Sequence, residues 1–325
     1  MDKLDFLKID SPDSFEELCL EIFRYQAEKV SIYKEYVSYL GIDPKEVKRI
    51  EQIPFLPIDF FKSHKIISED VKTEVIFSSS GTTGQTQSKH HVGDLSIYEK
   101  SFKAAFNRFY ANVSDYCILA LLPNYLEREG SSLVYMAQQL IDDSKHHKSG
   151  FYLHNHDELV QVLSSPELKE QKVILLGVTF ALLDLAEKYS ISKDQLIVME
   201  TGGMKGQRKE LVRDELHKLL CEKLNVDSIH SEYGMTELLS QAYSKGNGRF
   251  YCPPWMKVLI RDTNDPLTLV GNEQTGGMNI IDLANVYSCS FIMTQDLGKS
   301  YADGSFEVLG RFDSSDIRGC NLMVQ

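Results

Sequence analysis

The chain has 325 residues, of which 42% are hydrophobic and 25% are charged, as in an ordinary soluble globular protein. Its formal net charge of −12 argues against a nucleic-acid partner, because nucleic-acid binders present a basic face. No apolar run is long enough to span a bilayer and the first residues lack the layout of a secretory signal, so we expect a cytoplasmic protein with no membrane span.

The N-terminal part of the chain predicts helices followed by an extended segment. Residues 14–40 carry apolar side chains at helical spacing, and Gly41 ends this pattern. Residues 53–58 contain two prolines and cannot be helical throughout, so we expect an extended apolar arm laid over the body. Residues 74–77 predict a strand that runs directly into a loop of serine, threonine and glycine.

Short apolar strands then alternate with helical patterns. The strands are predicted at 118–122, 173–177 and 196–199, and the helices at 131–143, 180–189 and 207–224. This alternation predicts an α/β fold with a largely parallel sheet, whose ligands bind at the carboxyl ends of the strands.

The last part of the chain changes character. Gly, Asp and Asn turns separate short strands at 258–260, 278–281, 290–293 and 306–309, which predicts a C-terminal β-rich subdomain. We therefore expect an N-terminal helical segment and arm (1–72), an α/β body that binds the ligands (73–250), and a β-rich subdomain with a C-terminal tail (251–325).

The loop after the strand at 74–77 concentrates residues that bind phosphate. Glycines let backbone N–H groups converge on an anion, hydroxyls add donors, and a lysine adds positive charge. These residues are Ser79, Ser80, Gly81, Thr82, Thr83 and Gly84, followed by Lys89. The spacing is not that of a Walker loop, and composition alone fits a polar surface turn equally well.

Three further motifs follow in order along the chain. Residues 231–237 read Ser-Glu-Tyr-Gly-Met-Thr-Glu, residues 294–298 read Thr-Gln-Asp-Leu-Gly, and residues 310–313 read Gly-Arg-Phe-Asp. Together with the loop at 78–84, they resemble the ordered motifs of the adenylate-forming superfamily (acyl-CoA ligases, peptide-synthetase adenylation domains and firefly-type luciferases). The second of them departs from the pattern at Gln295, which stands in place of glycine. The resemblance implies the N-terminal-domain fold of that superfamily, with ATP and Mg²⁺ as cofactors.

The resemblance also implies a role for each motif residue. The adenine would stack on Tyr233, and the ribose hydroxyls would donate to a carboxylate, while a hard Mg²⁺ would take carboxylate oxygen. Gly202 and Gly203 would form another wall of the adenine pocket, and Glu232 and Gly234 are further cofactor-binding positions. Thr236 would contact the α-phosphate, with Lys89 as a second catalytic group, and Glu237 would hold Mg²⁺. Asp296 would bind the ribose, with Arg311 nearby. Tyr233 as a plain core residue and Asp296 as a turn cap are the alternatives.

Segments across nearly the whole chain are similar to the acyl-protein synthetases of bacterial bioluminescence operons, which also resemble phenylacetate–CoA ligases. These segments lie at 53–62, 122–134 and 316–322. Superfamily members usually continue beyond the Gly-Arg-x-Asp motif into a mobile lid that carries a lysine, and we expect this chain to lack that lid. The resemblance implies that a fatty acid is activated with ATP, moved onto a cysteine near the C-terminus and passed to a partner reductase.

Cys320 is the cysteine at the matching position. Gly319 precedes it and Arg318 lies two residues away, where a guanidinium lowers a thiol pKa and raises the thiolate fraction. A thiolate that attacks the acyl-adenylate expels AMP and leaves a thioester. The alternative is an inert thiol in a last strand formed by residues 322–324.

Residues that follow the strand at 118–122 lie where the acyl pocket is expected. Tyr125, Ser131 and Ser132 are the candidates for contact with the acid. Ser131 or Ser132 fits the N-cap of the following helix equally well.

Metal-site spacing is absent from the sequence. The six cysteines are far apart and form no C-x-x-C pair. The adjacent histidines at 90–91 and 146–147 have no second cluster of ligands, so we expect them to be hydrogen-bonded or solvated.

Two alternatives to an acyl-protein synthetase stay open at this point. In one, the acyl-adenylate is delivered to coenzyme A, to a carrier protein or to a sugar amine. In the other, the chain is a non-catalytic ATP-binding partner subunit of a reductase. The sequence leaves the identity of the acid and the oligomeric state open.

Overall fold

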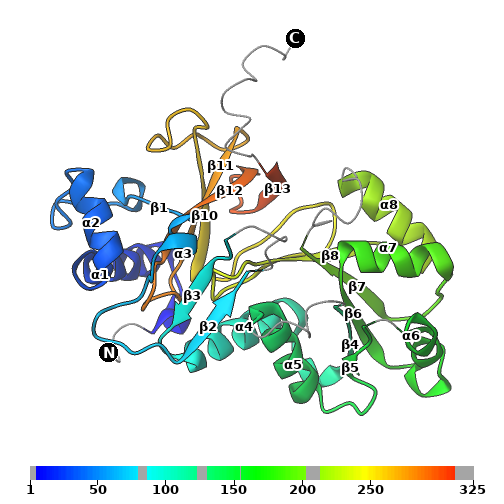
Figure 1. The fold of residues 1–325 in the computed structure, drawn as a ribbon. Helices are drawn as coiled ribbons and strands as arrows, with labels where there is room; N and C mark the ends of the chain where they lie inside the picture. Colours follow the sequence, from blue (N-terminus) through cyan, green and yellow to red (C-terminus); the bar gives the residue numbers. More distant parts are fainter. Residues whose placement is uncertain (1–4, 80–85, 123–129, 154, 203–212, 312–325) are drawn as a thin grey trace, which may run out of the picture.

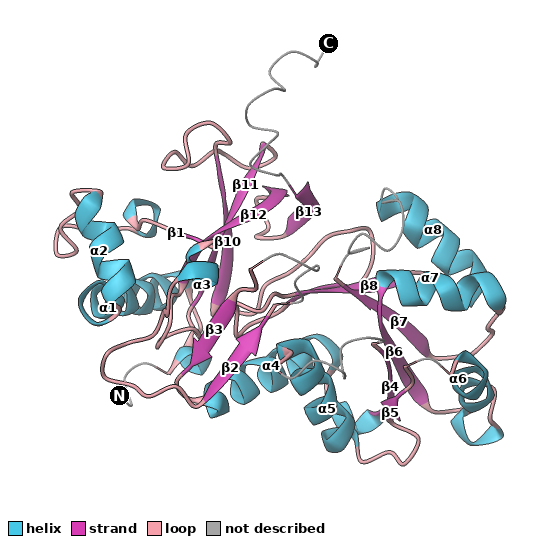
Figure 2. Ribbon diagram, in the orientation of Figure 1, coloured by secondary structure: helices cyan, strands magenta, loops and turns pink. Residues whose placement is uncertain are grey.

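The computed structural model describes residues 5–79, 86–122, 130–153, 155–202 and 213–311. Across these ranges the strands form a six-stranded sheet, a five-stranded sheet and a two-stranded hairpin. The two larger sheets stand side by side in Figure 1, and Figure 2 shows helices on the outer flank of each.

The six-stranded sheet forms the α/β body. Its order is β5-β4-β6-β7-β8-β9, and each pairing is parallel except that of β8 with β9. Its strands are β4 (Tyr116–Leu121), β5 (Gly150–Phe151), β6 (Lys172–Val178), β7 (Leu196–Thr201), β8 (Ile229–Tyr233) and β9 (Ala242–Ser244). Every residue of β4 is buried, as expected of an apolar strand covered on both faces.

Helices cover both faces of this sheet. In Figure 1, α4 and α5 lie on one side, and α6, α7 and α8 lie on the other. Their bounds are α4 (Leu95–Tyr110), α5 (Ser132–Ser144), α6 (His156–Leu163), α7 (Thr179–Lys188) and α8 (Arg213–Leu224). The α/β body with its largely parallel sheet is confirmed. Of the predicted helix at 207–224, residues 207–212 lie outside the described residues, and α4 was not predicted.

The five-stranded sheet is mainly antiparallel and is the predicted β-rich part. Its order is β1-β12-β11-β10, with β13 paired to the other part of β12. Its strands are β1 (Leu56–Pro57), β10 (Met256–Arg261), β11 (Thr275–Asp282), β12 (Phe291–Ser300) and β13 (Phe306–Arg311). The hairpin consists of β2 (Val75–Ser78) and β3 (Lys89–Val92), and it carries the predicted phosphate loop between its strands.

The N-terminal segment packs against the five-stranded sheet. It contains α1 (Pro12–Lys29), α2 (Ser31–Tyr39) and the short α3 (Phe60–Ser63). Ser11 caps α1 in a capping box, with Pro12 in the first turn, which are the residue types that helix N-termini favour. The single predicted helical region is divided because Val30 adopts an extended conformation between α1 and α2.

The predicted apolar arm reaches the last sheet of the chain. Strand β1 pairs in parallel with β12, and Ile58 N–H donates to the carbonyl of Met293 across 2.9 Å. The ring of Phe291, on β12, contacts Phe23 and Tyr33 from the two N-terminal helices. A strand from one end of the chain therefore completes a sheet built from the other end.

Four short 3₁₀ helices complete the secondary structure of the described residues: Phe6–Lys8, Ile50–Gln52, Val113–Asp115 and Pro166–Leu168. Within the same ranges, no helix combines the length and the apolar character needed to cross a bilayer.

Candidate nucleotide site

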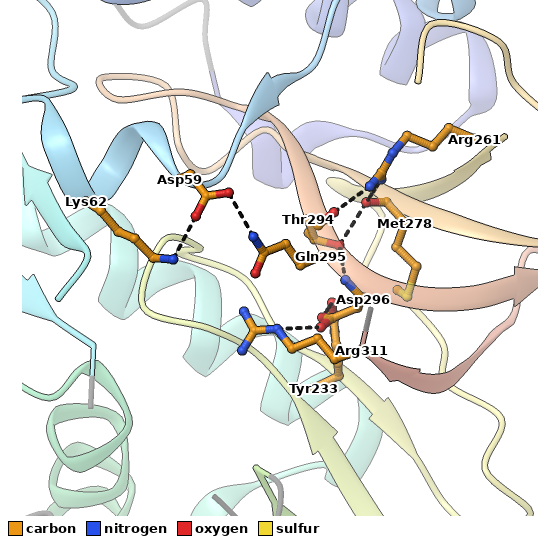
Figure 3. Close-up of polar contacts among 9 residues, drawn as sticks. All are labelled: Asp59, Lys62, Tyr233, Arg261, Met278, Thr294, Gln295, Asp296 and Arg311. Atoms are coloured by element: carbon orange, nitrogen blue, oxygen red, sulfur yellow. Dashed lines mark hydrogen bonds and ion pairs between the residues drawn. The ribbon is translucent and has the colours of Figure 1, made fainter. Parts of the chain in front are cut away.

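Three of the predicted site residues meet where the two large sheets approach each other. Tyr233 ends β8, Asp296 lies on β12 and Arg311 ends β13 (Figure 3). The Tyr233 hydroxyl donates to Asp296 Oδ2 across 2.7 Å, and Arg311 Nε lies 3.6 Å from Asp296 Oδ1. Asp296 and Arg311 face each other because they are register partners in the antiparallel pairing of β12 with β13. The structure thus brings three separate motifs into one cluster.

The carboxyl group of Asp296 lies at the edge of the core. Its side chain is 16% exposed, whereas that of Arg311 is 63% exposed. Burial raises the pKa of Asp296, and the hydrogen bond from Tyr233 and the charge of Arg311 oppose that rise. The ring of Tyr233 packs edge-on against Phe250 and Phe306, with centroids 5.9 and 5.6 Å apart. Tyr233 is therefore anchored by its neighbours and by its hydroxyl.

A buried arginine supports the backbone on which Asp296 lies. Arg261 donates from Nη2 to the carbonyl of Thr294 across 2.6 Å and from Nη1 to the carbonyl of Met278 across 2.7 Å. The Thr294 hydroxyl donates to the same Met278 carbonyl and accepts from Asp296 N–H at 3.1 Å. A Cβ at Gly277 would lie 2.4 Å from the guanidinium carbon, so a larger residue there would displace the guanidinium from these carbonyl groups. Arg261 was not predicted from the sequence.

Glu232, on β8, carries a buried carboxyl group. The Thr201 hydroxyl donates to Glu232 Oε2, and the two residues are register partners of β7 and β8. Burial raises the pKa of Glu232 to about 7, against the effect of this hydrogen bond. A Cβ at Gly234 would lie 2.5 Å from Glu232 Oε1. A larger residue at position 234 would therefore displace the carboxyl group of Glu232 from its present position.

A second buried carboxylate, Glu200, joins three elements at the carboxyl ends of the strands. Its oxygens accept from the hydroxyls of Thr179 at 3.1 Å and Ser231 at 3.0 Å, and Oε1 lies 2.9 Å from His217 Nε2. Burial alone would raise the pKa of Glu200, but the hydrogen bond from His217 and nearby positive charge lower it below its usual value. Thr179 also donates to the carbonyl of Gly202 across 2.7 Å, which fixes the start of the segment predicted to line the adenine pocket.

The predicted metal ligand Glu237 is only 5% exposed. Burial raises its pKa, and a hydrogen bond from Ser88 opposes the rise. Asn285 Nδ2 donates to the carbonyl of Glu237 across 2.7 Å. The ring of His90 lies between the carbonyl of Thr236, 2.8 Å from Nδ1, and Asn285 Oδ1, 2.9 Å from Nε2. His90 is thus hydrogen-bonded, as expected, and it links β3 to the motif that carries Thr236 and Glu237.

The ends of the predicted phosphate loop are joined by two hydrogen bonds. Ser79 N–H donates to the carbonyl of Ser88 across 3.0 Å, and Ser88 N–H donates to Ser79 Oγ across 2.9 Å. Lys89 is exposed and pairs with Ser78 in the hairpin. Several predicted site residues lie outside the described residues. In the phosphate loop these are Ser80, Gly81, Thr82, Thr83 and Gly84, and elsewhere they are Gly203, Tyr125 and Cys320.

The two serines proposed to contact the acid have structural partners. Ser131 caps α5, because its hydroxyl accepts from Val134 N–H at 3.3 Å. The carbonyl of Ser132 accepts from the Tyr98 hydroxyl at 3.0 Å, and Ser132 is buried. The N-cap expectation is confirmed for Ser131, and contact with the acid stays a prediction for both serines.

Two further residues hold the segment that follows Glu237. Asp282 Oδ2 accepts from the N–H groups of Leu239 at 2.7 Å and Ser240 at 3.0 Å, and Asn285 acts as described above. Neither was predicted, since in the sequence they stand among the Asp and Asn residues of ordinary turns. The one signal available in the sequence was that Asp282 and Asn285 closely follow the predicted strand at 278–281.

The fold is that of adenylate-forming enzymes. One similar solved structure is ATP-bound MatB from Rhodopseudomonas palustris, with a TM-score of 0.56 and 16% identity over 74% of this chain and 48% of MatB. Another is 2-hydroxyisobutyryl-CoA ligase in complex with 2-HIB-AMP and CoA, with a TM-score of 0.70 and 14% identity over 94% of this chain and 70% of the ligase. The chain thus spans about half the length of MatB.

Sequence comparison gives a narrower result. The chain is 22% identical to a long-chain-fatty-acid–luciferin-component ligase of Vibrio harveyi, over 93% of this chain and 85% of that protein. The family model "Acyl-protein synthetase, LuxE" matches residues 128–325, which is more than half of the chain. The matched range contains Tyr233, Asp296 and Arg311. The chain therefore belongs to the acyl-protein synthetase (LuxE) family.

Proposed function

We propose that this protein uses ATP to activate a long-chain fatty acid as an acyl-adenylate and transfers the acyl group to a protein thiol. The observation that carries the proposal is the cluster of Tyr233, Asp296 and Arg311. An aromatic face suits a purine, and a partly exposed carboxylate suits two ribose hydroxyl donors. The name of the relative from Vibrio harveyi supports the choice of a long-chain fatty acid.

The phosphates would lie between this cluster and the loop at 78–89. Lys89 and Thr236 would meet the α-phosphate, with the backbone N–H groups of the loop as further donors. Glu237 fits Mg²⁺, because this ion usually takes one or two carboxylates and completes its shell with phosphate oxygens and water. When bound, the ion would supply positive charge to the phosphates.

The chemistry needs positioning more than covalent help from the protein. A carboxylate oxygen of the acid bonds to the α-phosphorus while the bond to pyrophosphate breaks, and pyrophosphate leaves with the electron pair. The protein contributes alignment of the two reactants and donors that meet the developing charge. Asp296 and Tyr233 hold the nucleoside, and Lys89 and Thr236 act at the phosphate.

The acyl acceptor in this proposal is Cys320. Its thiolate attacks the carbonyl carbon of the acyl-adenylate, AMP leaves, and a thioester forms. A partner reductase would then receive the acyl group. We place this reaction in the cytoplasm, because ATP and reduced thiols occur together there.

Carboxylate-dependent exchange of pyrophosphate into ATP tests the first half of the proposal. We expect exchange with long-chain fatty acids, and no exchange without an acid. An absence of exchange across aliphatic and aryl acids of all lengths would show that the chain does not adenylate carboxylates.

Intact-mass spectrometry tests the second half. After incubation with Mg-ATP and mixed fatty acids, we expect a mass increase of one acyl group that survives denaturation and is removed by neutral hydroxylamine. The increase should disappear in Cys320→Ala and persist in Cys221→Ala, a cysteine in α8 that is partly buried. Equal labelling of Cys320→Ala and the parent protein would exclude this cysteine as the acceptor.

A further inference from the structure

The side chain of Gln295 reaches from the nucleotide cluster to the N-terminal arm. Gln295 Nε2 donates to Asp59 Oδ2 across 2.8 Å, and Lys62 Nζ lies 2.7 Å from Asp59 Oδ1. Figure 3 shows Lys62, Asp59 and Gln295 in a row that ends beside Asp296 and Arg311. Both oxygens of Asp59 are therefore engaged, one by the residue next to Asp296 and the other by a lysine ammonium.

Strand pairing explains why Asp59 meets Gln295. The parallel pairing of β1 with β12 sets Pro57 opposite Met293. Asp59 and Gln295 each follow two residues later, and their side chains meet just beyond the end of the paired segment. The residue that departs from the glycine of the superfamily motif thus provides the link to the arm.

Helix α3 fixes Lys62 on the same framework as the phosphate motifs. The neighbouring residue, Phe61, is buried, and its ring packs edge-on against His90 with centroids 5.7 Å apart. His90 in turn contacts the carbonyl of Thr236. The backbone at Lys62 is therefore held against β3, which carries Lys89, and against the motif that carries Thr236.

The positive charge of Lys62 also favours the ionised form of the buried carboxyl of Glu237. Burial raises the pKa of Glu237, whereas Ser88, Arg311 and Lys62 oppose the rise. The hydrogen-bonded row from Lys62 leads through Asp59 and Gln295 to the strand of Asp296, the ribose candidate. On its other side, α3 packs on His90, which contacts the motif of the phosphate and metal candidates. In a nucleotide, the group between the ribose and the leaving pyrophosphate is the α-phosphate.

The side chain of Lys62 also keeps the capacity to bind a ligand. An ammonium has three N–H donors, and Asp59 takes one of them. The side chain is 42% exposed, so an oxygen of a ligand can reach Nζ. An exposed ion pair of this kind contributes little to stability. The hydrogen bond from Gln295 to Asp59 instead orients this ion pair, and with it the Lys62 ammonium, toward the site.

We propose that Lys62 contacts the α-phosphate of the bound nucleotide and offsets its negative charge during adenylation. Asp59 and Gln295 are positioning residues that aim the ammonium. The inference rests on the proposed function. In the step, the carboxylate oxygen bonds to the α-phosphorus, the bond to pyrophosphate breaks, and pyrophosphate leaves with the electron pair.

The first experiment measures ATP–pyrophosphate exchange with a saturating fatty acid. Lys62→Met removes the charge but keeps the stem, and we expect kcat to fall by about 100-fold, the usual loss for one donor to a developing charge. The KM for ATP should change much less, and Lys62→Arg should recover part of the rate. Gln295→Ala should lower kcat by several-fold, because Asp59 then holds the Lys62 ammonium in a less defined position.

Lys8→Met is the matched control. Lys8 also forms an i,i+3 ion pair, with Asp5 at 3.3 Å, but its side chain is 77% exposed and lies outside the site. We expect parental kcat in this variant. A Lys62→Met variant that exchanges as fast as Lys8→Met would overturn the proposal, while a parent protein without exchange would instead refute the proposed function.

The second experiment needs no catalysis. Calorimetry of AMP and of adenosine separates the phosphate contact from the nucleoside contact. We expect Lys62→Met to weaken AMP binding by about tenfold, a change typical of one charge-assisted hydrogen bond, and to leave adenosine binding unchanged. Equal loss for both ligands, or no loss for AMP, would show that Lys62 does not contact phosphate.

Discussion

The hydroxyl of Tyr233 donates to Asp296 Oδ2 across 2.7 Å and so ties the end of β8 to β12. Burial raises the pKa of Tyr233 well above its ordinary value, and the hydroxyl therefore acts as a donor at any physiological pH. This bond sets the direction of one carboxylate oxygen, while the other faces Arg311.

Tyr233→Phe keeps the ring and removes the donor. We expect the Kd for ATP to rise by about tenfold, because a hydrogen bond to a charged group is worth about 1.5–3 kcal/mol and its loss leaves Asp296 less well oriented. Calorimetry measures the change. Tyr251→Phe is the control, since the Tyr251 hydroxyl makes an exposed contact of 3.5 Å with Asp303; an equal effect in both variants would argue against the orienting role.

Asp296→Ala tests the ribose contact. We expect ATP binding to weaken by more than about tenfold, because two hydroxyl donors lose a charged acceptor. Binding of 2′,3′-dideoxy-ATP, which lacks both hydroxyls, should be the same in the variant and the parent. If ATP affinity measured by calorimetry is unaltered, Asp296 does not bind the ribose.

Glu237→Gln tests the metal ligand. The substitution keeps the shape and removes the charge, so we expect the Mg²⁺ concentration for half-maximal pyrophosphate exchange to rise by about tenfold. Glu69→Gln changes an exposed carboxyl and serves as the control. Unchanged activity of Glu237→Gln at limiting Mg²⁺ would contradict the assignment.

Arg261→Met tests the support beneath Asp296. Arg261 is 4% exposed, and its replacement removes the hydrogen bonds that its guanidinium donates to the carbonyls of Met278 and Thr294. We expect the free energy of unfolding to fall by about 2–4 kcal/mol, measured by urea titration. Lys257→Met, an exposed position on the same strand, should stay within about 0.5 kcal/mol of the parent. A similar loss in both variants would mean that the strand, and not the guanidinium, is sensitive.

His90 makes the stability depend on pH. Burial lowers its pKa to about 4, so between pH 6.5 and 4 the unfolded chain binds a proton that the folded chain does not. The contribution is fully present above about pH 6.5 and is lost as the pH falls toward 4. From pH 7 to pH 5, the stability advantage of the parent over His90→Gln should shrink by about 2 kcal/mol.

The comparison of parent and variant is needed because other buried groups titrate in the opposite sense. Burial raises the pKa of Glu232 to about 7 and that of Asp282 to about 6, so each of them lowers the stability as the pH rises through this window. These effects cancel in the difference between the parent and His90→Gln. A difference that does not vary with pH would show that His90 has an ordinary pKa.

The motifs predicted which residue types gather at the candidate nucleotide site, because their order along the chain is itself a strong pattern. Tyr233, Asp296 and Arg311 come from three motifs, and the pairing of β12 with β13 brings the last two together. The apolar strands were predictable for a simpler reason. An apolar run such as that of β4 is typical of a strand that is covered on both faces of its sheet.

Contacts that join distant parts of the chain could not be predicted. Arg261 and Asn285 are polar residues whose burial follows only from the packing of strands and loops around them. Asp59 meets Gln295 because β1 pairs with β12, and nothing in a two-residue strand specifies its partner. Helix α4 was missed although Tyr98 and Phe102 recur at helical spacing, since aromatic residues have modest helix propensity.

The pairing of β1 with β12 has a consequence for biosynthesis. Leu56 must wait for Ile292 to be made, and at ordinary rates of translation that delay is about 10–50 s. During this interval the apolar arm has no sheet to join, so it is exposed to chaperones and to other nascent chains. Gln295 cannot orient Asp59 during the same period, because Gln295 is also made late. The candidate nucleotide site combines residues that are made early with residues that are made late, so it can be completed only after β12 has been synthesised.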